Sequence, residues 1–134
     1  MKNITIIGWT DWFWKWLADF LIKNFWEEIS LIITWRNIKK WERVADELWC
    51  DFSDNNLESV KNADLVIFAV PIAFMEKTIE EIAPNIEKWA VAADICSIKI
   101  WPSLALKKYS PEWVLVIPTH PMFWPFVSTI AWQI

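Results

Sequence analysis

Two polar side chains in the last third of the chain have the chemistry that proton transfer requires. Ser97 follows a predicted strand over 90–94, and His120 follows a predicted strand over 114–117. A histidine can accept the proton of a substrate hydroxyl while hydride leaves the carbon that bears it, and a nearby serine can hold the imidazole in one tautomer. A lone histidine is more often structural, but His120 lies outside any apolar stripe. We therefore predict that the two residues meet at one edge of a sheet and are catalytic.

The glycine and tryptophan contents of the chain are both abnormal. The 134 residues include one glycine and 13 tryptophans, whereas average glycine usage is about 7%. Trp26, Trp49 and Trp89 each follow a predicted helix end, where the next residue is commonly left-handed and glycine is favoured. Glycine at every tryptophan position except Trp16 would restore an ordinary glycine content. We hypothesise that glycine has been systematically replaced by tryptophan, by design or by an error in the recorded sequence; the alternative is a naturally aromatic-rich core.

The proposed replacement of glycine by tryptophan also affects the turn that directly follows the first predicted strand. With glycine at positions 9, 12 and 14, the segment would be a glycine-rich turn that opens a helix. Backbone N–H groups of such a turn can approach a pyrophosphate at the helix N-terminus. Asp11 departs from the usual dinucleotide pattern, which has its middle glycine at that position. The cofactor-binding residues predicted here are Gly8, Trp9, Thr10, Asp11, Trp12, Phe13 and Trp14.

The loop after the second predicted strand contains cations instead of an acid. NAD-binding domains usually place a carboxylate there to bind the ribose 2′-hydroxyl. Arg36 can stack on adenine or grip a 2′-phosphate, and its polar neighbours add further contacts. We therefore expect NADP as the cofactor rather than NAD, although a solvated loop of charges is the alternative. The residues concerned are Thr34, Arg36, Asn37 and Lys39.

Short β-branched runs alternate with helical patterns along the chain, and these elements must position the candidate residues. Strands are predicted over 4–7, 29–34, 51–53, 65–70, 90–94 and 114–117, and helices over 13–24, 39–48, 57–62, 72–82 and 103–108. The run 65–70 is continuously apolar, as in a strand covered on both faces, and Pro71 ends it. Strands that alternate with helices imply right-handed crossovers. The predicted fold is a doubly wound α/β domain over 1–134, a mainly parallel sheet of the Rossmann type with helices on both faces.

Several segments resemble the prephenate and arogenate dehydrogenase family. With glycine at position 124, the segment 120–125 is similar to the family's His-Pro-Met-Phe-Gly-Pro signature, and Ser97-Ile98-Lys99 is similar to its Ser-x-Lys element. The opening turn through Lys15-Trp16, the turn after the second strand and Val70-Pro71-Ile72 match as well. The resemblance covers nearly the whole chain, and the histidine segment is its most specific part.

The resemblance implies an oxidoreductase of tyrosine biosynthesis, for which the cationic loop indicates NADP as the cofactor. We expect a location in the cytoplasm, because the apolar runs are too short for a membrane span or a secretory signal. In the family, hydride passes from the substrate ring to the nicotinamide while the ring loses carbon dioxide and becomes aromatic. The resemblance makes His120 the general base that binds the substrate hydroxyl and Ser97 the residue that orients it, and it adds Val70 and Pro71 to the cofactor site. Lys99 stays open between a catalytic role and a solvated lysine at a helix start.

Members of the family continue with a helical domain that forms the dimer and contributes cationic side chains to the substrate site. That domain is absent from the 134 residues, so we expect a homodimer only with it and little turnover by this domain alone. Two alternatives remain. One is an inactive Rossmann-like scaffold, because indoles in the opening turn would occupy the space that a pyrophosphate needs. The other is a deazaflavin-dependent NADP reductase, which has similar turns but does not account for Ser97 and His120.

Charge, apolar run lengths and residue counts argue against several other classes of protein. The net charge of −4 argues against a nucleic-acid partner. The apolar runs fall short of the ~20 residues that cross a bilayer, and the apolar run at the N-terminus is too short for a secretory signal. Cys50 and Cys96 do not form a disulfide framework, and a single histidine rules out a histidine-rich metal site. The expected partner is a small-molecule substrate, with no metal, nucleic acid or membrane.

Overall fold

A computed structural model describes residues 1–8, 12–35 and 38–122, except the side chains of residues 12, 14 and 38–42. The strands are β1 (Lys2–Ile7), β2 (Ile29–Thr34), β3 (Asp51–Ser53), β4 (Leu65–Phe68), β5 (Val91–Asp94) and β6 (Leu115–Pro118). The helices are α1 (Trp12–Phe25), α2 (Ile38–Leu48), α3 (Asn56–Ser59), α4 (Ile72–Ile82) and α5 (Ile100–Tyr109), with a 3-10 turn η1 (Ala83–Asn85) after α4. Within this part of the chain, no helix is long and apolar enough to cross a membrane.

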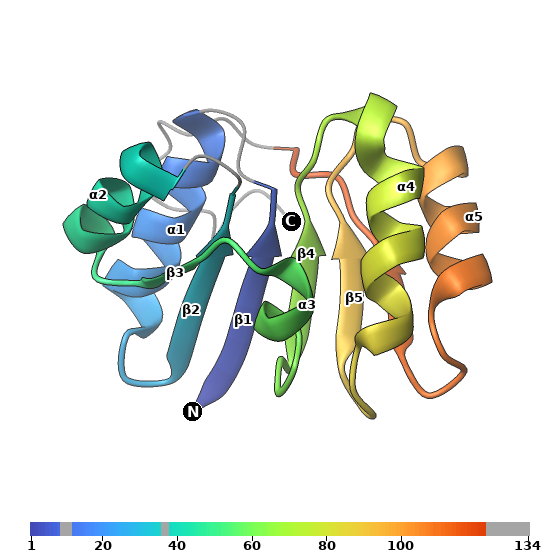
Figure 1. Ribbon diagram of the computed structural model, residues 1–134, viewed down its shortest axis with the longest axis horizontal. Coiled ribbons are helices and arrows are strands. Elements are labelled where there is room, and N and C mark those ends of the chain that lie inside the picture. The colour runs from blue at the N-terminus through green and yellow to red at the C-terminus, as the bar shows by residue number, and fades with distance from the viewer. Residues whose placement is uncertain (9–11, 36–37, 123–134) are drawn as a thin grey trace.

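The strands form one parallel sheet in the order β3-β2-β1-β4-β5-β6, which Figure 1 shows with its strands side by side. This order confirms the predicted Rossmann fold, because the chain winds outward from β1 in one direction and then, from β4, in the other. The reversal between β1 and β4 opens a crevice at the carboxyl ends of these strands. Ligands of such sheets bind there.

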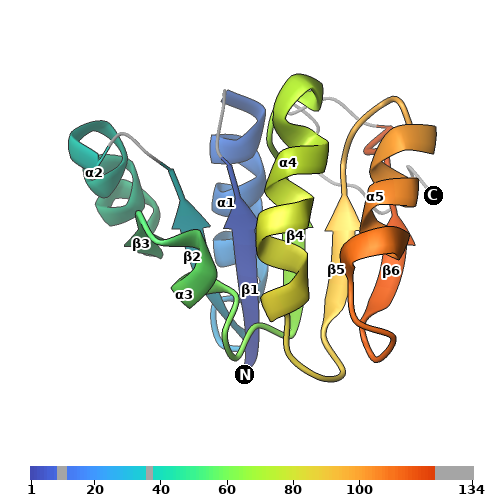
Figure 2. The same ribbon diagram turned by 45° about the vertical axis from the view of Figure 1, so that its right-hand side comes forward.

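Both faces of the sheet are buried, as predicted from the apolar strands. Successive residues of β4 illustrate the alternation: Phe68 belongs to a core beneath α4 and α5, whereas Ile67 belongs to a core that includes residues of α1 and α2. In both views α4 lies in front of the sheet and α1 behind it (Figure 2). A strand with apolar side chains on both faces needs cover on both, so the helices divide between the two sides.

Several element boundaries differ from the prediction, mostly near prolines. β4 ends at Phe68 instead of at residue 70, and Pro71 caps the start of α4. α5 begins at Ile100, three residues earlier than predicted, because Pro102 fits the first turn of a helix, where its missing N–H costs no hydrogen bond. α3 ends at Ser59, so the predicted helix 57–62 is too long.

Trp49 occupies a position that normally requires glycine. The Trp49 N–H donates to the Asp46 carbonyl at 3.4 Å, and the Cys50 N–H donates to the Ala45 carbonyl at 3.1 Å. These two bonds form a Schellman motif at the end of α2, in which the residue after the cap is left-handed and usually glycine. Trp49 has a φ of 60°. The prediction of a left-handed residue after this helix is confirmed.

Trp89 and Trp26, the other two tryptophans predicted to follow a helix with a left-handed φ, differ from Trp49. Trp89 has a φ of 73° but lies in a turn after η1 rather than directly after a helix. The Ala90 N–H donates to the Glu87 carbonyl at 3.3 Å, and the third residue of a type II turn needs positive φ. Trp26 follows α1 as predicted, but its φ is not positive, so that part of the prediction is wrong. Positive φ thus supports the glycine hypothesis at two of these three positions.

We expect Trp49→Gly to raise the free energy of unfolding by about 1 kcal/mol, because a left-handed conformation costs a non-glycine residue roughly 1–2 kcal/mol and glycine loses more entropy on folding. The Trp49 side chain is 88% exposed, so little packing is lost. Urea unfolding followed by circular dichroism measures the change. Trp26→Gly is the matched control, since Trp26 is also exposed after a helix but lacks positive φ. Equal stabilisation by both substitutions would contradict the strain at Trp49.

Candidate active site

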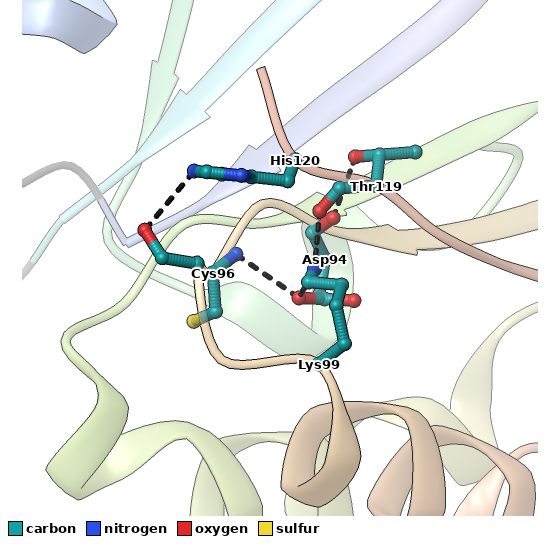
Figure 3. Close-up of polar contacts among 6 residues, drawn as sticks. Asp94, Cys96, Lys99, Thr119 and His120 are labelled. Carbon is teal, nitrogen blue, oxygen red and sulfur yellow. Dashed lines mark hydrogen bonds and ion pairs between the residues drawn. The ribbon is translucent and has the colours of Figure 1, made fainter. Parts of the chain in front are cut away.

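Ser97 and His120 lie against each other at the carboxyl edge of the sheet. The Ser97 Oγ and His120 Nε2 atoms are 3.0 Å apart, within hydrogen-bonding distance; in Figure 3 a dashed line marks this contact of the His120 ring. The register of β5 and β6 explains the approach, because it pairs Asp94 with Pro118 and so ends both strands at one level. The predicted meeting of the two side chains is confirmed, while their catalytic roles stay predictions.

A buried carboxylate supports the loop that carries Ser97. Asp94, the last residue of β5, has an exposed fraction of 0%. Its Oδ1 accepts a hydrogen bond from the Cys96 N–H at 3.0 Å, as expected if Asp94 caps the next turn. The Lys99 ammonium contacts the same carboxylate and the Thr119 carbonyl. Lys99 is therefore held between two loops, and the interpretation as a solvated lysine at a helix start is wrong.

The two cysteines are free thiols with little nucleophilic character. Burial raises the pKa of the Cys50 thiol to about 12, and the neighbouring charge of Asp51 adds to the shift. Burial also raises the pKa of the Cys96 thiol, with a further contribution from Asp94. Because the thiolate is the nucleophile, both cysteines are protonated and poorly reactive at neutral pH. In the described ranges, no group of three or more histidine, cysteine or acidic residues could hold a metal ion.

A cavity of about 210 Å³ lies at the switch point of the sheet and contains four of the predicted cofactor-binding residues. Gly8, Thr34, Val70 and Pro71 come from the ends of β1, β2 and β4. The register aligns these ends, since Ile7 pairs with both Thr34 and Phe68. The complete lining is Gly8, Thr34, Trp35, Asp54, Asn56, Val70, Pro71, Phe74 and Thr78.

Gly8 is the residue of this cavity whose backbone most strictly requires glycine. Its φ is 79°, and a Cβ atom added there would lie 2.1 Å from Val70 Cγ1. The Gly8 N–H donates to Thr34 Oγ1 at 3.3 Å. A bare main chain therefore borders the cavity at the start of the predicted phosphate turn, which is the arrangement that lets a backbone approach a pyrophosphate.

The remaining predicted cofactor residues contribute less to the described site. The half-buried Phe13 side chain packs against the core that includes α1 and α2. Trp9, Thr10, Asp11, Arg36 and Asn37 lie outside the described residues, as do the side chains of Trp12, Trp14 and Lys39.

Sequence reasoning missed the wall of the cavity that comes from distant elements. Asp54 and Asn56 follow β3, and Phe74 and Thr78 lie one helical turn apart on α4. The position of Asp54 after a third strand could have been noticed. Its side chain supplies an acid at this cavity, although the loop after β2 contains none. A larger cavity of about 670 Å³ lies around Met1 and Ile29, at the amino end of β2, the opposite edge from the one where such sheets bind ligands.

Comparison with known proteins identifies relatives of the chain. Residues 22–131 match the family described as prephenate dehydrogenase, nucleotide-binding domain. A "Probable arogenate/prephenate dehydrogenase" of Methanocaldococcus jannaschii is 44% identical over 138 residues, which cover 100% of this chain and 30% of that protein. The chain thus spans about 30% of the length of this curated relative.

Solved structures show the same fold at low sequence identity. Prephenate dehydrogenase from A. aeolicus, in complex with hydroxyphenyl propionate and NAD+, has a TM-score of 0.75 and 14% identity over 91% of this chain and 42% of its own. Synechocystis arogenate dehydrogenase has a TM-score of 0.69 and 18% identity over 80% of this chain and 37% of its own. Since the family match extends over most of the chain, this protein belongs to the family of prephenate dehydrogenase nucleotide-binding domains.

Proposed function

We propose that the chain is the nucleotide-binding domain of an NADP-dependent prephenate or arogenate dehydrogenase, which works by oxidative decarboxylation in tyrosine biosynthesis. The observation that carries the proposal is the 3.0 Å contact between Ser97 Oγ and His120 Nε2, on the same sheet edge as the Gly8 cavity. The name of the M. jannaschii relative supports the substrate class. The family match does not favour an inactive scaffold or a deazaflavin-dependent reductase.

The described residues fit a dinucleotide cofactor. A Cβ atom at Gly8 would collide with Val70, so the main chain is bare where a pyrophosphate would approach. Gly8 and the turn after it would hold the pyrophosphate, and Thr34 with the loop that contains Arg36 would hold the adenosine half. When bound, the nicotinamide dinucleotide supplies a hydride acceptor. The NAD+ complex of the A. aeolicus neighbour supports a nicotinamide cofactor of either type.

His120 can act as the base if one ring nitrogen keeps a lone pair. Neutral imidazole has one N–H and one acceptor nitrogen. When Nε2 carries the proton and donates a hydrogen bond to Ser97 Oγ, Nδ1 is the nitrogen that can take the proton of the substrate hydroxyl. In this proposed arrangement Ser97 is the acceptor that holds the ring, and both side chains are exposed at the edge where a substrate can reach them.

The remaining parts of the proposed enzyme come from outside the described site. The chain spans 30% of its curated relative, and we assign dimerisation and the cationic side chains for a dianionic substrate to the helical domain of the family. Within this domain, the catalytic pair belongs to the half of the sheet formed by β4, β5 and β6. In doubly wound folds the two halves of a dinucleotide bind to the two halves of the sheet, so the nicotinamide would lie on the side of His120.

Titration of NADP+ and NAD+ into the Trp9→Gly/Trp12→Gly/Trp14→Gly variant tests the proposal, because its opening turn has no indoles. We expect saturable micromolar binding of NADP+ and weaker binding of NAD+, because Arg36 can pair with a 2′-phosphate. Arg36→Ala should remove this preference while NAD+ affinity stays the same. Asp54 would act in the opposite direction and favour NAD+, since a carboxylate on the cavity wall favours ribose hydroxyls over a phosphate. The measured preference therefore shows which of the two residues dominates. Tighter binding of NAD+ would contradict the NADP preference, and no binding of either would favour the scaffold.

A further inference from the structure

The ammonium group of Lys99 lies between the two loops that carry the catalytic pair. Its Nζ donates to the Asp94 carboxylate, at the end of β5, and to the Thr119 carbonyl, just after β6. Figure 3 shows Lys99 beneath these two groups, with His120 on the other side of Thr119. One cation therefore ties together two segments that are separate in sequence.

Further hydrogen bonds extend this tie to the residues next to the catalytic pair. The Thr119 N–H and Oγ1 both donate to the Asp94 carbonyl, at 3.0 and 2.6 Å. The Asp94 carboxylate also holds the Cys96 N–H. Thr119 directly precedes His120, and Cys96 directly precedes Ser97. Each catalytic residue thus follows a residue whose backbone is fixed to the Asp94–Lys99–Thr119 cluster.

The positions of Ser97 and His120 depend on this cluster because both side chains are exposed and gain little from core packing. Asp94, in contrast, is fully buried, and in the described part of the chain its Oδ2 has no hydrogen-bond partner. A buried carboxylate is stable when an opposite charge compensates it. The Lys99 ammonium contacts it directly, so loss of Lys99 would release Thr119 and leave the Asp94 charge uncompensated.

We propose that Lys99 is a positioning residue that keeps Ser97 and His120 at hydrogen-bonding distance by joining the loops after β5 and β6. It acts through Asp94 and Thr119, without touching the substrate. The catalytic meaning of this assignment rests on the proposed function, but the tautomer of His120 that it controls exists in the chain without any ligand. The inference can therefore be tested separately from cofactor binding and turnover.

Nuclear magnetic resonance of the ¹⁵N-labelled, tag-free chain provides a direct readout, because His120 is the single histidine in the sequence. Long-range ¹H–¹⁵N spectra report which ring nitrogen carries the proton. We expect two distinct ring nitrogens in the wild type. In the double variant Lys99→Met/Asp94→Asn, which removes cation and buried charge together, we expect both shifts to move toward the average of two exchanging tautomers. The single variant Lys99→Arg, which retains the charge and the donors, should keep the two ring-nitrogen shifts of His120 distinct.

Matched variants decide between this role and a general effect on folding. Lys107→Met replaces an exposed lysine of α5, the helix that Lys99 precedes, and should leave the His120 signals unchanged. If the double variant does not fold, Lys99→Gln takes its place, since the shorter, neutral glutamine side chain cannot compensate the Asp94 charge and should cause partial averaging. Wild-type His120 signals in a folded double variant, or equal averaging in Lys107→Met, would overturn the proposal.

Turnover gives a second measurement in a protein that joins this domain to the helical domain of the family. We expect Lys99→Met/Asp94→Asn to lower kcat by about 10²-fold, as misplacement of a catalytic group does, with the cofactor KM unchanged and recovery in Lys99→Arg. An inactive wild type would contradict the proposed function alone, because the His120 spectra still decide the positioning role. Unchanged kcat in the double variant would contradict the positioning role.

Discussion

Replacement of His120 by asparagine is expected to lower kcat by about 10²–10⁴-fold, the usual contribution of a general base, in a protein that joins this domain to the helical domain. Asparagine can still form a hydrogen bond with Ser97, but it cannot accept a proton at neutral pH. His120 is exposed and outside both hydrophobic cores, so the fold should not change. The dissociation constant of NADP+, measured by titration, should stay at the wild-type value.

A comparison with Ser97→Ala separates the two predicted roles. In the proposed mechanism, Ser97 orients the imidazole through the 3.0 Å contact with Nε2, whereas His120 takes the proton itself. Ser97→Ala should therefore lower kcat less than His120→Asn does. Turnover retained in His120→Asn would remove the histidine from the mechanism, and a parallel loss of NADP+ affinity would assign it to cofactor binding.

The second large effect concerns the opening turn. The triple variant Trp9→Gly/Trp12→Gly/Trp14→Gly is expected to bind NADP+ with a micromolar dissociation constant, whereas a chain with indoles at these positions should show no saturable binding. Trp12 and Trp14 belong to the first turn of α1, so we expect the bulk of the indoles, rather than backbone strain, to exclude a pyrophosphate from the helix N-terminus. Gly8 shows how little space this turn leaves, since one added carbon atom would collide with Val70.

Two measurements check this prediction. Isothermal titration measures the NADP+ affinity of the triple variant and of a control variant. In the control, the exposed Trp26, Trp101 and Trp113 are replaced by glycine, so the same chemical change is made away from the turn. The mass of the protein purified from its natural source decides whether the indoles are present, because each exchange turns a hydrogen into an indole. Equal NADP+ affinity with and without the three indoles would contradict our account of the turn.

The sheet was the most predictable part of the structure. β2 and β3 have the predicted bounds; the largely apolar, β-branched run of β2 leaves few alternatives, and the short β3 pairs with its end. The start of α5 was missed since a proline inside a helical pattern usually indicates its end, whereas Pro102 lies in the first turn. Trp49 and its left-handed φ followed from the local rule for helix ends, which needs no knowledge of the tertiary structure.

The candidate site was predictable in part. Gly8 and Thr34 were predicted from the turns after the first two strands and Val70 from the family resemblance, and the meeting of Ser97 with His120 was predicted because strand ends of a parallel sheet lie at one edge. Asp54 and Phe74 line the same cavity, but their approach depends on how α4 packs on the sheet. The role of Lys99 was equally hidden, since its acceptor Thr119 comes close only through the register of β5 and β6.

The reversal of winding direction between β1 and β4 has an evolutionary consequence. The cavity draws its residues from the segment between β1 and α4, while Ser97, Lys99 and His120 depend on the pairing of β5 with β6. In the proposed enzyme, substitutions that change the coenzyme preference can therefore accumulate without disturbing the acid–base pair, and substitutions near that pair need not alter the coenzyme site.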